Sequence, residues 1–163
     1  MSFLVFPSPS QLAIFGGAGA LLSALLGVAC GHLKLRRGVA TNYTRKIFHF
    51  GIFTTAMMLQ AGWGLVAVNA YATGCVAVIL FGVARGRGNP IFEGMARERD
   101  EPHRAFFVVV PLITTALGGL TSNWVAGHFA LVGYLVTGWG DAIGEPAGRR
   151  FGRHPYRVLS LRK

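Results

Sequence analysis

Residues 105–140 form one stretch without Asp, Glu, Lys or Arg: AFFVVVPLITTALGGLTSNWVAGHFALVGYLVTGWG. A helix needs about 20 apolar residues to cross a hydrocarbon core of about 30 Å. The stretch is long enough for two such helices if the chain turns at the uncharged Thr121–Asn123 segment. We therefore predict two membrane spans here, at residues 105–120 and 124–140.

The rest of the chain contains three more apolar runs, at residues 12–31, 45–61 and 64–84. The chain has 163 residues, of which 52% are hydrophobic and only 13% are charged, and its mean hydropathy is +0.48. A soluble domain carries roughly 25% charged residues. The composition therefore excludes a disordered chain, a disulfide scaffold and an ordinary soluble enzyme. It predicts an all-α fold, a polytopic integral membrane bundle of about five transmembrane helices that forms one domain, residues 1–163.

The charged residues are few and unevenly distributed. Sixteen Lys and Arg against six Asp and Glu give a net charge of +10, and the charges fall at or near three segments, 32–44, 85–104 and 141–163. A nucleic-acid binder spreads its basic residues over a soluble fold, so we expect no nucleic-acid partner. With five spans all three segments face one side, which the positive-inside rule identifies as cytoplasmic, and the N-terminus lies outside. The oligomeric state stays open.

Small residues recur every four positions in the first span, at Gly19, Ser23, Gly27 and Gly31. Such a face lets two membrane helices approach closely. We expect this helix to serve packing and assign no function to it. The cysteines Cys30 and Cys75 both fall within spans, where each is expected to be a small buried side chain.

The second span begins with ionisable residues. If the helix starts at Arg45, that residue and His49 are i,i+4 neighbours, and Lys46 and His49 are i,i+3 neighbours. Anchoring at the cytoplasmic surface explains Arg45 and Lys46 but not a histidine one turn deeper. Ionisable groups within an apolar helix indicate a functional site.

The last span runs into a glycine-rich segment in which Asp141 and Glu145 lie four residues apart. Glycines at 144 and 148 let the backbone approach a bulky anion, and Arg149 adds positive charge. Carboxylates repel phosphate unless a metal lies between them. The combination predicts a Mg²⁺-bound nucleoside triphosphate, although no Walker A sequence is present because Gly148 is followed by two arginines.

These two patterns together resemble the CTP-dependent lipid-alcohol kinases, the phytol kinase and dolichol kinase group. The matching residues are Arg45, Lys46, His49, Gly140, Asp141, Gly144, Gly148, Arg149, Gly152 and His154. The resemblance covers residue 42 to the C-terminus. It implies an integral membrane enzyme that transfers the γ-phosphoryl of CTP to a prenol-type lipid alcohol (phytol, dolichol or similar) with a divalent metal. Members of the group continue with further apolar spans, so the resemblance implies a C-terminally truncated member.

The expected site assigns a role to each of these groups. We expect His49, Asp141 and Glu145 to be catalytic, with both carboxylates holding Mg²⁺. The residues expected to bind nucleotide phosphates are Arg45, Lys46, Gly144, Gly148 and Arg149. The partners are then the lipid bilayer, CTP and the lipid alcohol, and the site faces the cytoplasm. Two alternatives stay open: a phosphatidate cytidylyltransferase-like enzyme that also uses CTP, and a non-catalytic membrane subunit or carrier.

Overall fold

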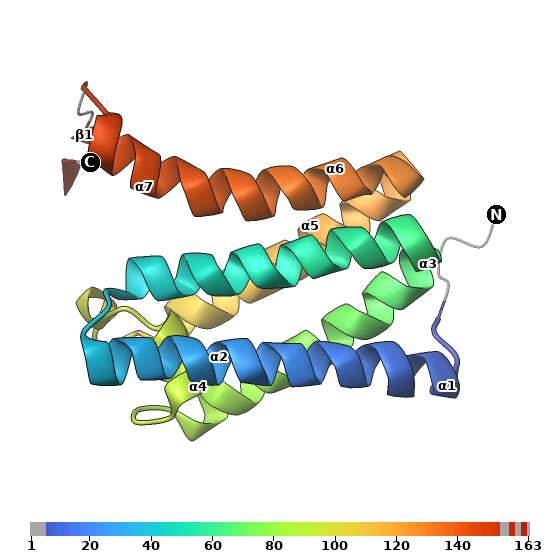
Figure 1. Ribbon diagram of the computed structural model, residues 1–163, viewed down its shortest axis with the longest axis horizontal. Coiled ribbons are helices and arrows are strands. Elements are labelled where there is room, and N and C mark those ends of the chain that lie inside the picture. The colour runs from blue at the N-terminus through green and yellow to red at the C-terminus, as the bar shows by residue number, and fades with distance from the viewer. Residues whose placement is uncertain (1–5, 154–156, 159–160, 163) are drawn as a thin grey trace.

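The computed structural model describes residues 6–153, 157–158 and 161–162, without the side chains of Glu145, Pro146, Arg149 and the residues after 153. The described chain is a bundle of long helices (Figure 1), which confirms the expected all-α class. The helices in order are α1 (Pro9–Gln11), η1 (Leu12–Gly16), α2 (Gly17–Arg37), α3 (Thr41–Arg85), α4 (Pro90–Met95), η2 (Glu98–Asp100), α5 (Phe106–Ala126), η3 (Gly127–Phe129), α6 (Ala130–Leu135), η4 (Val136–Gly140) and α7 (Asp141–Phe151). Near the C-terminus β1 (Arg157–Val158) and β2 (Leu161–Arg162) form an antiparallel pair with Arg157 opposite Arg162.

Three helical segments of the described chain are long and apolar enough to cross a membrane: Pro9–Arg37, Thr41–Arg85 and Phe106–Gly144. This composition and length make the chain an integral membrane protein of the helical class. The two longer segments each reverse direction once, and Figure 1 shows both reversals at the right-hand end of the bundle. The structure therefore gives three candidate segments where five separate spans were expected, and the number of crossings stays a prediction.

The reversal inside α3 lies at Gly64, at the boundary between the expected runs 45–61 and 64–84. Its backbone has φ 75° and ψ −168°, a conformation that a side chain would oppose.

The second turn was expected at Thr121–Asn123, and this prediction is wrong. Helix α5 continues to Ala126, and the chain reverses at Gly127, which has φ 55°. Nothing in the earlier segment breaks the helix, because Asn123 keeps a helical backbone and donates its side-chain amide to the Gly119 carbonyl at 2.8 Å. Only the glycine admits the positive φ that the reversal needs.

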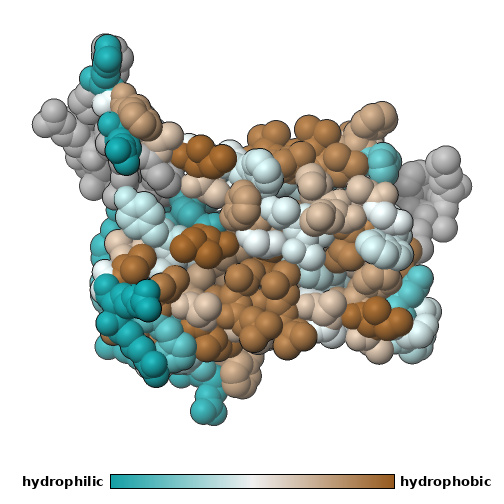
Figure 2. All heavy atoms as spheres, in the orientation of Figure 1, coloured by the Kyte–Doolittle hydropathy of each residue, from teal (hydrophilic) through white to brown (hydrophobic). Residues whose placement is uncertain are grey.

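The hydrophilic residues gather at one end of the bundle. Figure 2 shows most of the hydrophilic surface at the left-hand end, with an apolar band across the middle. Helix α2 ends there, α3 begins there, and α4 and the end of α7 lie there (Figure 1). The basic segments therefore share one end, as the sequence predicted, while the assignment of this end to the cytoplasm stays a prediction.

The small residues of α2 pack closely, which confirms the expected packing face. All four are buried. A Cβ atom at Gly19 would overlap with the carbonyl oxygen of Tyr71 in α3, and one at Gly31 would overlap with the carbonyl oxygen of Pro90 in α4. Cys30 and Cys75 are buried free thiols, also as expected.

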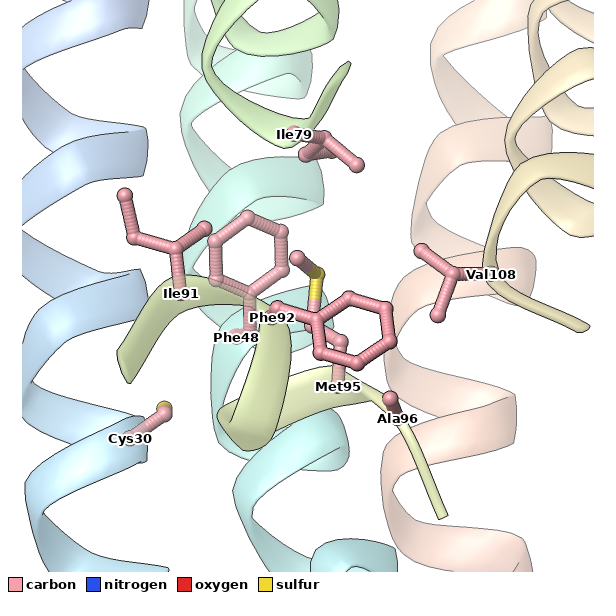
Figure 3. Packing of buried hydrophobic residues seen from close by; sticks show 8 residues of the cluster. All are labelled: Cys30, Phe48, Ile79, Ile91, Phe92, Met95, Ala96 and Val108. Atoms are coloured by element: carbon pink, nitrogen blue, oxygen red, sulfur yellow. The ribbon is translucent and has the colours of Figure 1, made fainter. Parts of the chain in front are cut away.

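Helix α4 is a short helix that the sequence did not reveal. Its N-cap is Asn89, whose side chain accepts hydrogen bonds from the backbone N–H groups of Ile91 and Phe92 at 3.0 and 3.4 Å. Its apolar residues lie between α2, α3 and α5 (Figure 3) and form a core with residues of those helices. That core consists of Cys30, Phe48, Ile79, Ile91, Phe92, Met95, Ala96 and Val108.

Candidate functional site

The site lies at the polar end, where the first turns of α3 meet the start of α7. Helix α2 ends because Gly38 adopts the left-handed conformation, with φ 65° and ψ 19°. After Ala40 the chain reverses into α3. The Thr44 hydroxyl then donates to the Gly94 carbonyl at 2.7 Å, which joins the start of α3 to α4.

Lys46 lies five residues after the first residue of α3, about one and a half turns into the helix, and contacts an acid that is far away in the sequence. Its side chain is 9% exposed, and its Nζ forms an ion pair with Oδ1 of Asp141. A buried ammonium group is costly without an opposite charge. The pairing of Lys46 with Asp141 therefore provides the charge compensation that this position needs.

His49 reaches the same carboxylate from the next turn of α3. Its Nδ1 lies 3.4 Å from Oδ2 of Asp141, and the histidine side chain is 29% exposed. The structure thus brings together three of the expected site residues, Lys46, His49 and Asp141. Asp141 itself is half-exposed, so one face of the carboxylate is open to a ligand.

The glycine-rich segment is helical up to Phe151. Gly144 and Gly148 lie within helix α7, not in a loop, so their backbone N–H groups take part in helical hydrogen bonding. The expectation that these glycines let the backbone approach a bulky anion stays a prediction. Among the described residues, and apart from the adjoining backbone of α7, no atom lies within 4 Å of a Cβ built at either glycine, so both are exposed on the helix near Asp141.

Two of the expected site side chains, Glu145 and Arg149, lie outside the described side chains, although their backbone belongs to α7. Glu145 follows Asp141 by four residues on this helix, which puts both on one face. Arg45 is half-buried at the start of α3, one residue before Lys46.

The side chains at this site could hold Mg²⁺ only if the substrate phosphates supplied some of its ligands. Among the described residues, no three or more His, Cys, Asp or Glu side chains cluster to hold a metal ion. Mg²⁺ in nucleotide sites is bound by one or two carboxylates together with substrate phosphates. The half-exposed carboxylate of Asp141 meets that requirement.

A surface hollow of about 290 Å³ lies one helical turn from Lys46. Its lining residues are Ala40, Thr41, Asn42, Arg97, Glu98 and Arg99. Asn42 and Lys46 are i,i+4 neighbours on α3 and so lie on one face of that helix. The Nε atom of Arg97 is buried and has no hydrogen-bond partner among the described residues.

A buried ionic cluster supports this end of the bundle, and sequence analysis missed it. It joins Lys34 of α2, Glu93 of α4 and Arg104, which precedes α5. Nη2 of Arg104 lies 2.7 Å from Oε2 of Glu93, and Nη1 lies 3.4 Å from Oε1. Nζ of Lys34 lies 3.4 Å from Oε2 of Glu93 and 2.6 Å from Oε1 of Glu98. The sequence signal that could have indicated a helix around Glu93 is Asn89-Pro90, a pair typical of a helix start.

The opposite charges in this cluster shift the pKa of Glu93, Glu98 and Arg104 in the direction that favours the charged form. Burial raises the pKa of Glu93, but the hydrogen bond from Arg104, the Gly88 N–H group and the charge of Lys34 outweigh it, so the pKa is lowered. The hydrogen bond from Lys34 lowers the pKa of Glu98 in the same way. The hydrogen bond to Glu93 raises the pKa of Arg104. All three groups are therefore charged near neutral pH.

These features define a class: a helical integral membrane protein with a site of one carboxylate, one lysine and one histidine at the polar end of its bundle. The chain is similar to the phytol kinase of Synechocystis sp., with 31% identity over 124 residues, which cover 74% of this chain and 49% of that enzyme. The chain therefore spans about half the length of the curated relative it matches. The similarity supports a phytol-kinase-like family. No family model matches the chain, and no solved structure matches it.

Proposed function

We propose that this chain transfers the γ-phosphoryl group of CTP to the hydroxyl of a prenol-type lipid alcohol at the cytoplasmic face of a membrane. The observation that carries the proposal is the convergence of Lys46 and His49 of α3 on Asp141. The similarity to a curated phytol kinase supports a lipid alcohol as acceptor. The choice of CTP rests on the sequence resemblance.

In this mechanism charged groups position and neutralise the phosphates, which is how protein catalysts accelerate phosphoryl transfer. Lys46 binds a phosphate oxygen in place of its contact with Asp141, and Arg45 and Arg149 neutralise the remaining ones. Asp141, with Glu145 as a second ligand, would hold Mg²⁺, which when bound supplies charge neutralisation at the β- and γ-phosphates. The hollow beside Asn42 offers the nucleotide room, and the buried Nε atom of Arg97, which lines it, has no acceptor among the described residues.

His49 is the group that meets the lipid hydroxyl. Its Nδ1 faces Asp141, which leaves Nε2 for the acceptor alcohol. In the proposed step Nε2 takes the hydroxyl proton while the alcohol oxygen bonds to the γ-phosphorus and CDP leaves. The carboxylate orients the ring, as carboxylates do in other acid–base sites.

The direct test incubates the purified protein in mixed micelles with phytol, dolichol or a shorter prenol, Mg²⁺, and γ-labelled CTP or ATP. We expect a labelled lipid monophosphate with CTP and a loss of at least about 100-fold in the Asp141→Asn variant, in the range reported for loss of a charge-stabilising group. Asp100→Asn, which removes an acid from the same end of the bundle, is the matched control and keeps its activity.

The open alternatives give different products. Phosphatidate and CTP would yield a CDP-lipid and pyrophosphate from a cytidylyltransferase, and this product would overturn the kinase proposal. A non-catalytic subunit would bind no CTP and would tolerate Arg45→Ala. Full activity of the Asp141→Asn variant would remove Asp141 from the mechanism.

A further inference from the structure

One face of α3 meets the segment around Asp141 along a continuous line of contacts. Residues of α3 spaced by three and four positions share a face of the helix. The contacting residues of α3 are Lys46, His49, Phe50, Phe53 and Thr54, and those of the other segment are Gly138, Trp139 and Asp141. The two contacts of Asp141 lie at one end of this line, and contacts of uncharged residues continue it one to two turns deeper.

Gly138 is the point of closest approach. It is buried, and a Cβ atom at this position would overlap with Cβ of Phe53 and lie 3.1 Å from its Cγ. Any larger residue would push the two helices apart at this point. Because Asp141 lies only three residues further on, such a displacement moves the carboxylate as well.

Trp139 fixes the second contact. Its indole Nε1 donates a hydrogen bond to Oγ1 of Thr54 at 3.0 Å, and its ring lies 5.1 Å from that of Phe50, centroid to centroid. A tryptophan near the end of an apolar helix commonly lies at the membrane interface, with its indole N–H group among the headgroups. Here the N–H group is used within the protein, so the residue sets the register of the two helices.

The backbone between these contacts and Asp141 is a π-helical turn, Val136–Gly140. Such a turn takes in one residue more than an α-helical turn, and π-turns are frequent at functional sites. Each residue in an α-helix occupies about 100° of rotation. The extra residue therefore turns everything after it by about that angle and decides which face of α7 carries Asp141.

We propose that Thr54, Trp139 and Gly138 are positioning residues that hold Asp141 in register with Lys46 and His49. When the Thr54–Trp139 hydrogen bond is lost, α7 turns or slides relative to α3, and the Lys46–Asp141 pair opens part of the time. The positioning of Asp141 by these residues concerns the fold alone. Its effect on turnover rests on the proposed function.

The first experiment measures the pair without measuring activity. The protein in micelles is acetylated briefly with an amine-reactive reagent, and the labelling of each lysine is read by mass spectrometry. Lys34 is the internal reference, because its side chain is also 9% exposed and ion-paired, with Glu93 and Glu98. We expect Thr54→Val and Trp139→Phe each to raise the labelling of Lys46 about fivefold, the shift that loss of a typical hydrogen bond produces.

Two comparisons make the result specific. The Thr54→Val/Trp139→Phe double variant should label like either single variant, because both remove the same bond. Thr73→Val is the matched control, since within the described part of the chain the Thr73 hydroxyl bonds only the Asn69 carbonyl of its own helix, at 2.9 Å, and this variant should leave Lys46 unchanged. Unchanged labelling in the Thr54 and Trp139 variants, or an equal rise at Lys34, would overturn the proposal.

The second experiment measures turnover in the same variants. We expect a fall in kcat of about fivefold with an unchanged KM for the lipid, and a larger fall in Gly138→Ala. Gly118→Ala, where no atom lies within 4 Å of the added Cβ, is the control for the last change. If labelling of Lys46 changes while even the unmodified protein transfers no phosphoryl group, the proposed function fails and the positioning role stands. An active protein whose kcat is unaffected in both the Thr54 and Trp139 variants overturns the positioning role.

Discussion

The substitution Glu93→Gln tests whether the buried ionic cluster holds the polar end together. The Glu93 carboxylate accepts from Arg104 at 2.7 and 3.4 Å, from Lys34 at 3.4 Å and from the Gly88 N–H group at 3.2 Å. Glutamine has the same shape but removes the negative charge and places an NH₂ group against a cation. The lysine and the arginine then lose the acid that they share.

The expected loss in the free energy of unfolding follows from the burial of both partners. Glu93 is 7% exposed and Arg104 is 6% exposed, and removal of one partner from a buried pair costs about 3–5 kcal/mol. Arg104 keeps the Ala96 carbonyl at 2.8 Å and Lys34 keeps Glu98 at 2.6 Å. We therefore expect the lower end of this range, about 3 kcal/mol, which is a large part of a total stability of about 5–15 kcal/mol.

The measurement is reversible unfolding in mixed micelles by titration with a denaturing detergent, followed by far-UV circular dichroism. The control is Arg87→Gln, which removes the cation of an exposed pair with Glu101 and leaves the carboxylates of the cluster in place; the two side chains are 73% and 41% exposed. Exposed pairs contribute about 0–1 kcal/mol. Equal midpoints for the two variants, or a Glu93→Gln midpoint like that of the unmodified protein, would refute the reasoning.

Three further predictions use the same unfolding assay. Gly31→Ala should lower the free energy of unfolding by at least about 1–3 kcal/mol, because the added Cβ overlaps with the Pro90 carbonyl. In the control Gly17→Ala the added Cβ meets no atom within 4 Å, so this variant should be neutral or slightly stabilising. Equal effects of the two substitutions would contradict the close packing at Gly31. Asn89→Ala should cost about 1 kcal/mol through loss of the α4 cap, and an unchanged midpoint would argue against the cap. Folding lowers the pKa of Glu93, so the ionised carboxylate stabilises the fold at a pH above the unfolded pKa of about 4.5, and this stabilisation is lost as the pH falls below that value. A free energy of unfolding that stays constant from pH 5 to pH 3 would contradict this prediction.

Local features of the sequence were enough to predict part of the fold and part of the site. The charge-free runs predicted apolar helices because a membrane span depends on length and composition alone. The i,i+4 spacing of small residues in α2 predicted a packing face, and the spacing of Lys46 and His49 predicted a shared helix face. The turn at Gly127 was missed because several uncharged positions near it were equally acceptable by composition.

Other features depended on contacts between distant segments. Helix α4 is six residues long, too short to show a period, and its stability comes from Asn89 and from burial against α2, α3 and α5. The sequence showed residues 85–104 only as a charged segment outside the spans, yet Glu93 and Arg104 are buried in it. A charge pattern in sequence carries no information on which partner each group meets.

The amino-acid sequence by itself determined that this chain is a helical membrane protein whose basic segments share one end, since both properties follow from composition and periodicity. It also named Lys46, His49 and Asp141 as the chemically unusual residues. Only the tertiary structure decided that they meet, because their contact depends on the close approach at Gly138 and on the π-helical turn before Asp141. Both features arise from the packing of α3 against a helix that lies 92 residues away along the chain.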